Sequence, residues 1–214
     1  PPDWKATDKR PAIVFFFGGG WNQGTVKQFE PQAKYLASRG MVASRADYRV
    51  KSRQGVTPDA CVEDAKSAVR WLRKNSGDLG IDPNRIVASG GSAGGHIAAC
   101  TGATPGFDAS DEDESISSVP NAMVLYNPVL KFSGYEQLMT RIDNDEKLGH
   151  ALSPTLHVNK NTPPALIHFG DADRLYEHGK DYMTAAEKAG GKAEMYVAEG
   201  QAHGFFNRPP WLQR

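Results

Sequence analysis

Three residues of this 214-residue sequence have side chains suited to nucleophilic catalysis: Ser92, Asp173 and His203. A serine hydroxyl is a weak nucleophile near neutral pH, so it needs a base to take its proton and a third group to orient that base. His203 is the best candidate for the base because it stands in a glycine-flanked loop directly after an apolar run. Asp173 follows the preceding apolar run and is the best candidate for the orienting acid. The sequence therefore predicts a catalytic triad.

Ser92 stands in the segment Gly90-Gly91-Ser92-Ala93-Gly94, which has the pattern Gly-x-Ser-x-Gly. The β-branched run 85–89 precedes it and the small, apolar run 96–100 follows it, which predicts a strand, a sharp turn and a helix. This is the context of a nucleophile elbow. The pattern also occurs by chance in glycine-rich turns between a strand and a helix, so the other elements must decide between the two interpretations.

The apolar runs of the chain alternate with helical patterns. Strands are predicted at 12–17, 41–47, 85–89, 122–126, 165–169 and 193–197, and helices at 29–36, 58–74, 96–100 and 182–189. A short helix is predicted near 135–140 within an otherwise loop-like region. This alternation predicts an α/β fold with a mostly parallel sheet of about six strands and helices on both faces. Functional side chains should then gather at the carboxyl ends of the strands.

The glycine triplet 18–20 follows the first strand and should reach the same edge of the sheet as the predicted triad. We expect the backbone N–H groups of Gly19, Gly20 and Ala93 to form an oxyanion hole, aided by the helix that begins behind Ser92. Trp21 either lines the substrate pocket or packs in the core. Further candidate substrate contacts at strand ends are Asn127, Arg174 and Leu175.

Four blocks of the sequence resemble the signature motifs of α/β-hydrolase carboxylesterases. They are Phe17-Gly18-Gly19-Gly20-Trp21, Gly90-Gly91-Ser92-Ala93-Gly94-Gly95-His96, Gly170-Asp171-Ala172-Asp173 and Gly200-Gln201-Ala202-His203-Gly204-Phe205. The chain is similar to the branch related to hormone-sensitive lipase and to bacterial feruloyl and acetyl xylan esterases. The resemblance spans about 12–207 and implies a three-layer sandwich in one domain, 1–214, without a large cap domain.

The resemblance implies the order serine, acid, base along the chain, and it favours Asp173 over Asp171 as the acid of Gly-x-x-Asp. We expect Asp173 to hydrogen-bond to Nδ1 of His203 and Asp171 to stabilise the turn. The chain departs from the family at Phe17, where histidine is common. The family's first two strands and final helix are expected to be missing from the given sequence.

The implied reaction is hydrolysis of carboxylic esters with short acyl chains, or of acylated sugars, through an acyl-enzyme intermediate. One alternative is a serine peptidase of the same fold, which usually has an additional domain or an acidic patch for the substrate amine. The other alternative is a catalytically inactive hydrolase fold that binds a protein, but such proteins normally lose a triad residue. The sequence names neither the physiological ester nor the oligomeric state.

The composition limits the remaining function classes. Twenty-five basic residues balance 25 acidic ones, which gives no electrostatic reason to expect nucleic acid or an anionic membrane as a partner. We expect a soluble globular protein, cytoplasmic or secreted, without a cofactor or a metal. Cys61 and Cys100 are expected to be buried free thiols. The acidic run 111–114 is expected to be a solvated loop, and His96 is expected to make a structural hydrogen bond.

Overall fold

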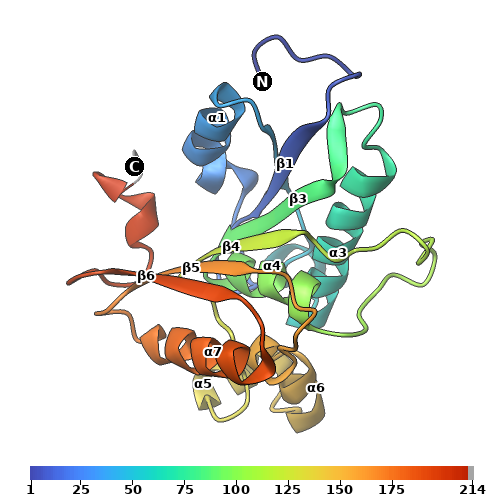
Figure 1. Cartoon of the computed structure of the whole chain (residues 1–214). Helices are drawn as coiled ribbons and strands as arrows, with labels where there is room; N and C mark the ends of the chain where they lie inside the picture. The colour runs from blue at the N-terminus through green and yellow to red at the C-terminus, as the bar shows by residue number, and fades with distance from the viewer. Residues whose placement is uncertain (212–214) are drawn as a thin grey trace.

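The computed structural model describes residues 1–211, and its centre is one parallel six-stranded sheet (Figure 1). The strands lie in the order β2-β1-β3-β4-β5-β6, and each neighbouring pair is parallel. Their bounds are β1 Arg10–Phe16, β2 Val42–Ala46, β3 Ile81–Gly91, β4 Ala122–Tyr126, β5 Ala165–Gly170 and β6 Ala193–Ala198. The predicted α/β fold is confirmed, and all six predicted strands are present.

Helices cover both faces of the sheet, as right-handed crossovers between parallel strands require. Helix α1 lies on one face, and α3, α4 and α7 lie on the other (Figure 1). The helices are α1 Glu30–Ser38, α2 Lys51–Gln54, α3 Pro58–Lys74, α4 Ala93–Ala103, α5 Glu136–Met139, α6 Glu146–Ala151 and α7 Tyr176–Ala189. Four 3₁₀ turns connect them: η1 Val26–Phe29, η2 Thr140–Ile142, η3 Pro154–Leu156 and η4 Phe205–Asn207.

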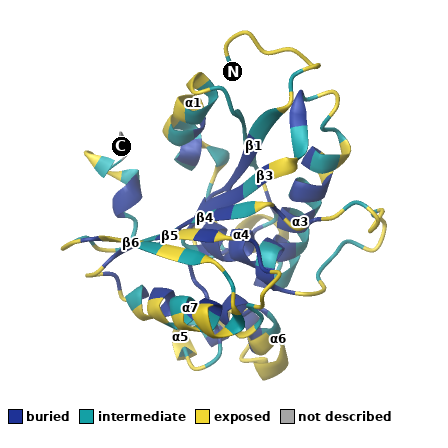
Figure 2. Ribbon diagram, in the orientation of Figure 1, coloured by how far each residue is buried: buried dark blue, intermediate teal, exposed yellow. Residues whose placement is uncertain are grey.

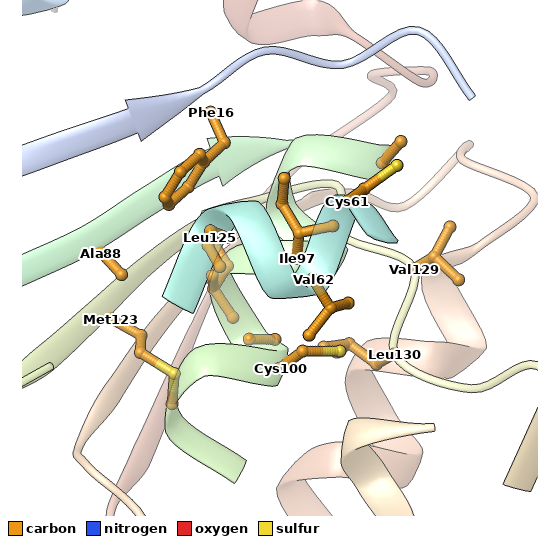
Figure 3. Packing of buried hydrophobic residues seen from close by; sticks show 14 of the residues in the cluster. Phe16, Cys61, Val62, Ala88, Ile97, Cys100, Met123, Leu125, Val129 and Leu130 are labelled. Carbon is orange, nitrogen blue, oxygen red and sulfur yellow. The ribbon is translucent and has the colours of Figure 1, made fainter. Parts of the chain in front are cut away.

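Strand β1 is apolar from Ala12 to Phe16 because both of its faces are covered. In β1, Ile13 and Phe15 pack in a cluster with Phe29 and Ala33, whereas Phe16 belongs to the larger cluster on the opposite face. Figure 2 shows buried residues along most of β1 and along the second half of β3, whereas buried and intermediate residues alternate in β4. Figure 3 shows the larger cluster, in which Ile97 of α4 packs between the sheet and α3. This packing fixes the strand ends that carry the predicted site.

The segment between β4 and β5 contains more regular structure than its polar sequence predicts. The predicted helix near 135–140 is present as α5 and η2, but α6 was not predicted. The side chain of Asp145 caps α6 by accepting hydrogen bonds from the N–H groups of Lys147 and Leu148. The Asp145 cap stabilises a helix that has little apolar periodicity, and Gly149 allows this helix to pack closely against Met139.

The expectation of a fully solvated acidic loop is wrong for Glu112. Its carboxylate pairs with the buried Arg70 of α3, and the neighbouring Asp108 pairs with both Arg70 and Lys66. Buried cations need such partners because an unpaired charge in the core is costly. This loop is therefore attached to α3.

Cys61 and Cys100 are buried free thiols, as predicted, and burial raises the pKa of each to about 12. Within residues 1–211, no helix is long and apolar enough to cross a membrane. No cluster of three or more potential metal-ligating side chains occurs in the described part of the chain.

Candidate active site

Ser92 occupies a sharp turn between β3, which ends at Gly91, and α4, which begins at Ala93. Its backbone has φ 56° and ψ −120°, a conformation that non-glycine residues rarely adopt. The turn requires small neighbours: a Cβ atom on Gly94 would collide with the carbonyl oxygens of Phe16 and Phe17. The close packing of α4 against the end of β1 therefore holds Ser92 in this conformation.

The structure brings the three predicted triad residues together at the carboxyl edge of the sheet. Oγ of Ser92 lies 2.9 Å from Nε2 of His203, and Nδ1 of His203 lies 2.8 Å from Oδ2 of Asp173. The carboxylate accepts a hydrogen bond from Nδ1, so Nε2 is free to accept the serine proton. The predicted hydrogen bond between Asp173 and His203 is present, whereas the catalytic roles of these residues remain predictions.

Asp173 is buried and has three hydrogen-bond partners. Oδ1 accepts from the N–H of Leu175 at 3.0 Å, and Oδ2 accepts from Nδ2 of Asn127 at 2.5 Å as well as from His203. Burial by itself would raise the pKa of this carboxyl, but the hydrogen bonds from His203 and Leu175 outweigh it and hold the pKa below its usual value. Asp173 is therefore an anion beside the imidazole.

Asp171 lies on the surface and makes a different contact. Its Oδ1 accepts a hydrogen bond from the N–H of Gly200 at 2.6 Å, which links the loops after β5 and β6. This is the turn-stabilising contact expected for Asp171.

The glycine loop after β1 has an unusual backbone. Gly19, Gly20 and Trp21 have φ angles of 135°, 63° and 56°. Glycine adopts the φ angle of Gly19 at little cost, because it has no Cβ atom. The N–H of Gly18 donates to Oε1 of Gln28 at 2.5 Å. By contrast, the N–H groups predicted to form the oxyanion hole, those of Gly19, Gly20 and Ala93, have no acceptor within residues 1–211. They are available to a ligand.

Phe17 stands where the related esterases commonly have histidine, and it anchors the loop. Its ring stacks on Tyr48 with the ring centroids 4.2 Å apart, and the Tyr48 hydroxyl donates to the Phe17 carbonyl at 2.6 Å. This contact with the segment after β2 keeps the loop in place without the histidine.

His96 makes structural hydrogen bonds, as predicted. Its Nδ1 accepts from Nε1 of Trp21 at 3.2 Å, and its Nε2 donates to the carbonyl of Leu152 at 2.8 Å. These partners define the tautomer because an indole N–H only donates and a carbonyl only accepts. Complete burial lowers the pKa of His96 to about 4, so the ring is neutral near pH 7.

A pocket of about 610 Å³ opens beside Ser92 and His203. Trp21, Arg174 and Leu175 line it, as the sequence suggested, although the Trp21 side chain is largely buried. Asn127 is not among the lining residues, so the suggestion that it contacts substrate is not supported. The remaining lining residues are Gly20, Val129, Gly134, Tyr135, Glu136, Gln137, Leu138 and Arg141. The contributions of Arg141 and of the segment 134–138 were not predicted from the sequence.

Two other histidines make contacts elsewhere in the fold. His178 lies fully buried in the first turn of α7, where its Nδ1 accepts from the N–H of Leu130 at 3.0 Å. His168 in β5 is partly buried and stacks on Tyr126. Neither belongs to the pocket beside Ser92.

Comparison with known proteins finds a matching family model and several related esterases. Residues 2–182 match the family model described as BD-FAE. Esterase LipQ of Mycobacterium tuberculosis is 27% identical over 96% of this chain and 52% of its own length. Carboxylesterase NlhH of the same organism is 28% identical over 94% of this chain and 68% of its own length. The chain thus spans about half the length of LipQ.

Solved structures include one with higher identity. The apo form of Thermogutta terrifontis esterase 2 superposes with a TM-score of 0.94 and is 48% identical, covering all of this chain and 82% of the esterase chain. These comparisons confirm the resemblance to α/β-hydrolase carboxylesterases that four sequence blocks indicated.

Proposed function

The chain belongs to the BD-FAE family, and from this premise we propose that it hydrolyses carboxylic esters through Ser92, His203 and Asp173. The observation that carries the proposal is the continuous hydrogen-bond chain from Ser92 Oγ to His203 and Asp173, next to three free N–H donors. The named relatives are esterases and carboxylesterases, which favours ester substrates over peptides.

The proposed reaction has two halves. His203 takes the proton of Ser92 as Oγ attacks the ester carbonyl carbon, and the imidazolium is stabilised by Asp173. The N–H groups of Gly19, Gly20 and Ala93 donate to the oxyanion, aided by the N-terminus of α4. His203 then gives the proton to the departing alkoxide, which leaves an acyl-serine. Water, deprotonated by the same imidazole, attacks the acyl group and releases the acid.

We infer that the acyl group is short. The wall of the pocket beside Ser92 includes the polar and charged side chains of Gln137, Arg141 and Arg174. Thermogutta terrifontis esterase 2 has been solved with propionate bound and with butyrate bound. These observations support acetyl to butyryl esters, including acylated sugars, as the substrate class.

The test is the variant S92A. Loss of the nucleophile is expected to lower the turnover of 4-nitrophenyl butyrate by several orders of magnitude, with thermal unfolding unchanged, because alanine fits the same turn. A second measurement uses paraoxon, which phosphorylates Thermogutta terrifontis esterase 2. Mass spectrometry should find one diethylphosphoryl group on the wild type and none on S92A. Retention of one tenth of the activity by purified S92A would refute the assignment.

A further inference from the structure

The pocket beside Ser92 contains more positive than negative charge. Among its lining residues, Arg141 and Arg174 are cationic, and Glu136 is the one carboxylate. All three are exposed to solvent at the pocket. A small ester that enters this pocket therefore approaches Ser92 past two guanidinium groups.

Arg141 lies in η2 and reaches over the oxyanion loop. Its Nη2 is 3.9 Å from the position that a Cβ atom on Gly20 would occupy. The guanidinium of Arg141 has no hydrogen bond or ion pair within residues 1–211. By contrast, the guanidinium groups of Arg10, Arg45, Arg49, Arg53 and Arg70 each pair with a carboxylate. No carboxylate of the described chain therefore neutralises the charge of Arg141 beside Ser92.

Arg174 directly follows Asp173, and its only side-chain partner in the described chain is uncharged. Nη1 of Arg174 donates to Oε1 of Gln137 at 3.3 Å. An amide oxygen orients the guanidinium but does not neutralise it. The remaining N–H groups of such a planar cation are well suited to a carboxylate, which accepts two parallel hydrogen bonds.

We propose that Arg141 and Arg174 form a subsite for a carboxylate on the substrate, so that the preferred esters are themselves anions. Such substrates include monoesters of dicarboxylic acids and acylated sugars that carry a carboxylate. The subsite rests on the proposed esterase function and specifies its substrate class. It changes no bond-making step, because the anion binds apart from the carbonyl that Ser92 attacks.

The test compares two pairs of esters that differ only in one charge. One pair has the charge on the acyl side: mono-4-nitrophenyl adipate and its methyl ester. The other has it on the alcohol side: 4-carboxyphenyl acetate and its methyl ester. The measured quantity is the ratio of kcat/KM for the anionic ester to that for the neutral ester of the same pair. Because both esters of a pair are measured with the same enzyme preparation, this ratio does not depend on the amount of active enzyme.

For at least one pair, the double variant R141Q/R174Q is expected to lower this ratio about fivefold to tenfold. R141K should retain part of the preference, and added salt should reduce it in the wild type. R85Q is the matched control because Arg85 is exposed and does not line the pocket. An unchanged ratio in the double variant for both pairs would overturn the subsite. Failure to hydrolyse any of the four esters would instead count against the proposed esterase function.

A separate observation concerns Asn127, which is buried and directly follows β4. Its Nδ2 donates to the same carboxylate oxygen of Asp173 that receives the His203 N–H. The backbone N–H of Asn127 donates to the His168 carbonyl at 2.7 Å, and its φ angle is 45°. Asparagine tolerates this left-handed conformation better than most residues. Oδ1 of Asn127 has no partner within residues 1–211.

We infer that Asn127 is a positioning residue for Asp173. Two donors on Oδ2 of Asp173 fix the orientation of the carboxylate. The amide donor also reduces the negative charge of the oxygen that binds His203. The other titratable group near Asp173 is His178 of α7, which is buried. Loss of the amide donor should strengthen the attraction between Asp173 and protonated His203. It should also leave the carboxylate held in its orientation by one side-chain donor fewer.

Two variants test this role without straining the backbone. N127G keeps the φ angle accessible, and N127D keeps the shape. N127G is expected to lower kcat about tenfold, to change KM little and to move the acidic limb of the kcat/KM profile to higher pH. N127D can share a proton with Asp173, so its activity relative to the wild type should fall as the pH rises from 6 to 9. Wild-type kcat and pH profiles in both variants would overturn the inference.

Discussion

The indole Nε1 of Trp21 donates a hydrogen bond of 3.2 Å to Nδ1 of His96, which joins the glycine loop after β1 to α4. The ring of His96 is also fixed on its other side by the Leu152 carbonyl. Neutral His96 therefore connects the loop after β1, the helix behind Ser92 and the segment between β4 and β5. A protonated ring cannot accept the Trp21 hydrogen bond.

The stability of the fold is expected to fall in acid because of this histidine. In the folded state the pKa of His96 is about 4, whereas an unfolded histidine has a pKa near 6.5. Between these values the unfolded state binds more protons, so the free energy of unfolding decreases as the pH falls from about 6.5 to 4. The contribution of His96 is about 3 kcal/mol. Urea unfolding at a series of pH values measures it.

The variant H96F removes this titration, so its unfolding free energy should depend less on pH across the same window, although it starts from a lower value at pH 7. H150Q is the control because His150 is exposed, and its pH dependence should match that of the wild type. Equal pH dependence in H96F and the wild type would contradict the prediction. His178, whose pKa burial also lowers to about 4, contributes in the same direction and persists in H96F.

Activity should show its own dependence on pH. The base must be neutral to accept the Ser92 proton, and histidine ordinarily gains a proton near pH 6–7. The pKa of Asp173 lies below its usual value, so this carboxylate stays charged through that range. We therefore expect kcat/KM for 4-nitrophenyl butyrate to decrease as the pH falls through 7 to 5. A rate that is constant down to about pH 4 would exclude a histidine base.

Short acyl chains should be preferred over long ones. The segment between β4 and β5 contributes Glu136, Gln137 and Arg141 to the pocket wall, and a long apolar chain would have to lie against these polar and charged side chains. The acetyl and butyryl esters of 4-nitrophenol are expected to be hydrolysed at least tenfold faster than the palmitoyl ester. S92A provides the rate of spontaneous hydrolysis for each ester. Faster hydrolysis of the palmitoyl ester by the wild type would contradict this expectation.

Much of this arrangement follows from local sequence. The run from Ala122 to Tyr126 is apolar, and it forms β4 with the predicted bounds. Gly90 and Gly94 around Ser92 predicted the sharp turn because a larger side chain does not fit there. In a parallel sheet these signals also predict which loops meet, because all carboxyl ends lie at one edge.

Contacts between distant segments do not follow in the same way. The amide of Asn127 binds a carboxylate 46 positions away, and no local pattern distinguishes it from a turn-forming asparagine. The ion pair between Arg70 and Glu112 likewise depends on how the loop folds back onto α3. Such features become visible only when the chain is folded.

The variants D173N and D171N distinguish the roles of the two neighbouring carboxylates after β5. D173N should keep the side chain in place but offer the wrong partner to Nδ1 of His203, since an amide favours the unproductive tautomer. Turnover is expected to fall by roughly 10⁴. D171N replaces the carboxylate oxygen that accepts from the N–H of Gly200, 2.6 Å away on the surface of the protein, with an uncharged and weaker amide acceptor. It should lower the free energy of unfolding by about 1 kcal/mol and leave kcat within about threefold of the wild type.

The two variants are matched in chemistry and differ by two positions in one loop, so each serves as the control for the other. Turnover of 4-nitrophenyl butyrate and urea unfolding, measured on both, separate a catalytic effect from a structural one. Equal losses of turnover in D171N and D173N, with both proteins folded, would contradict the assignment of Asp173 as the orienting acid. A large loss confined to D173N is expected because only Asp173 lies 2.8 Å from the imidazole of His203.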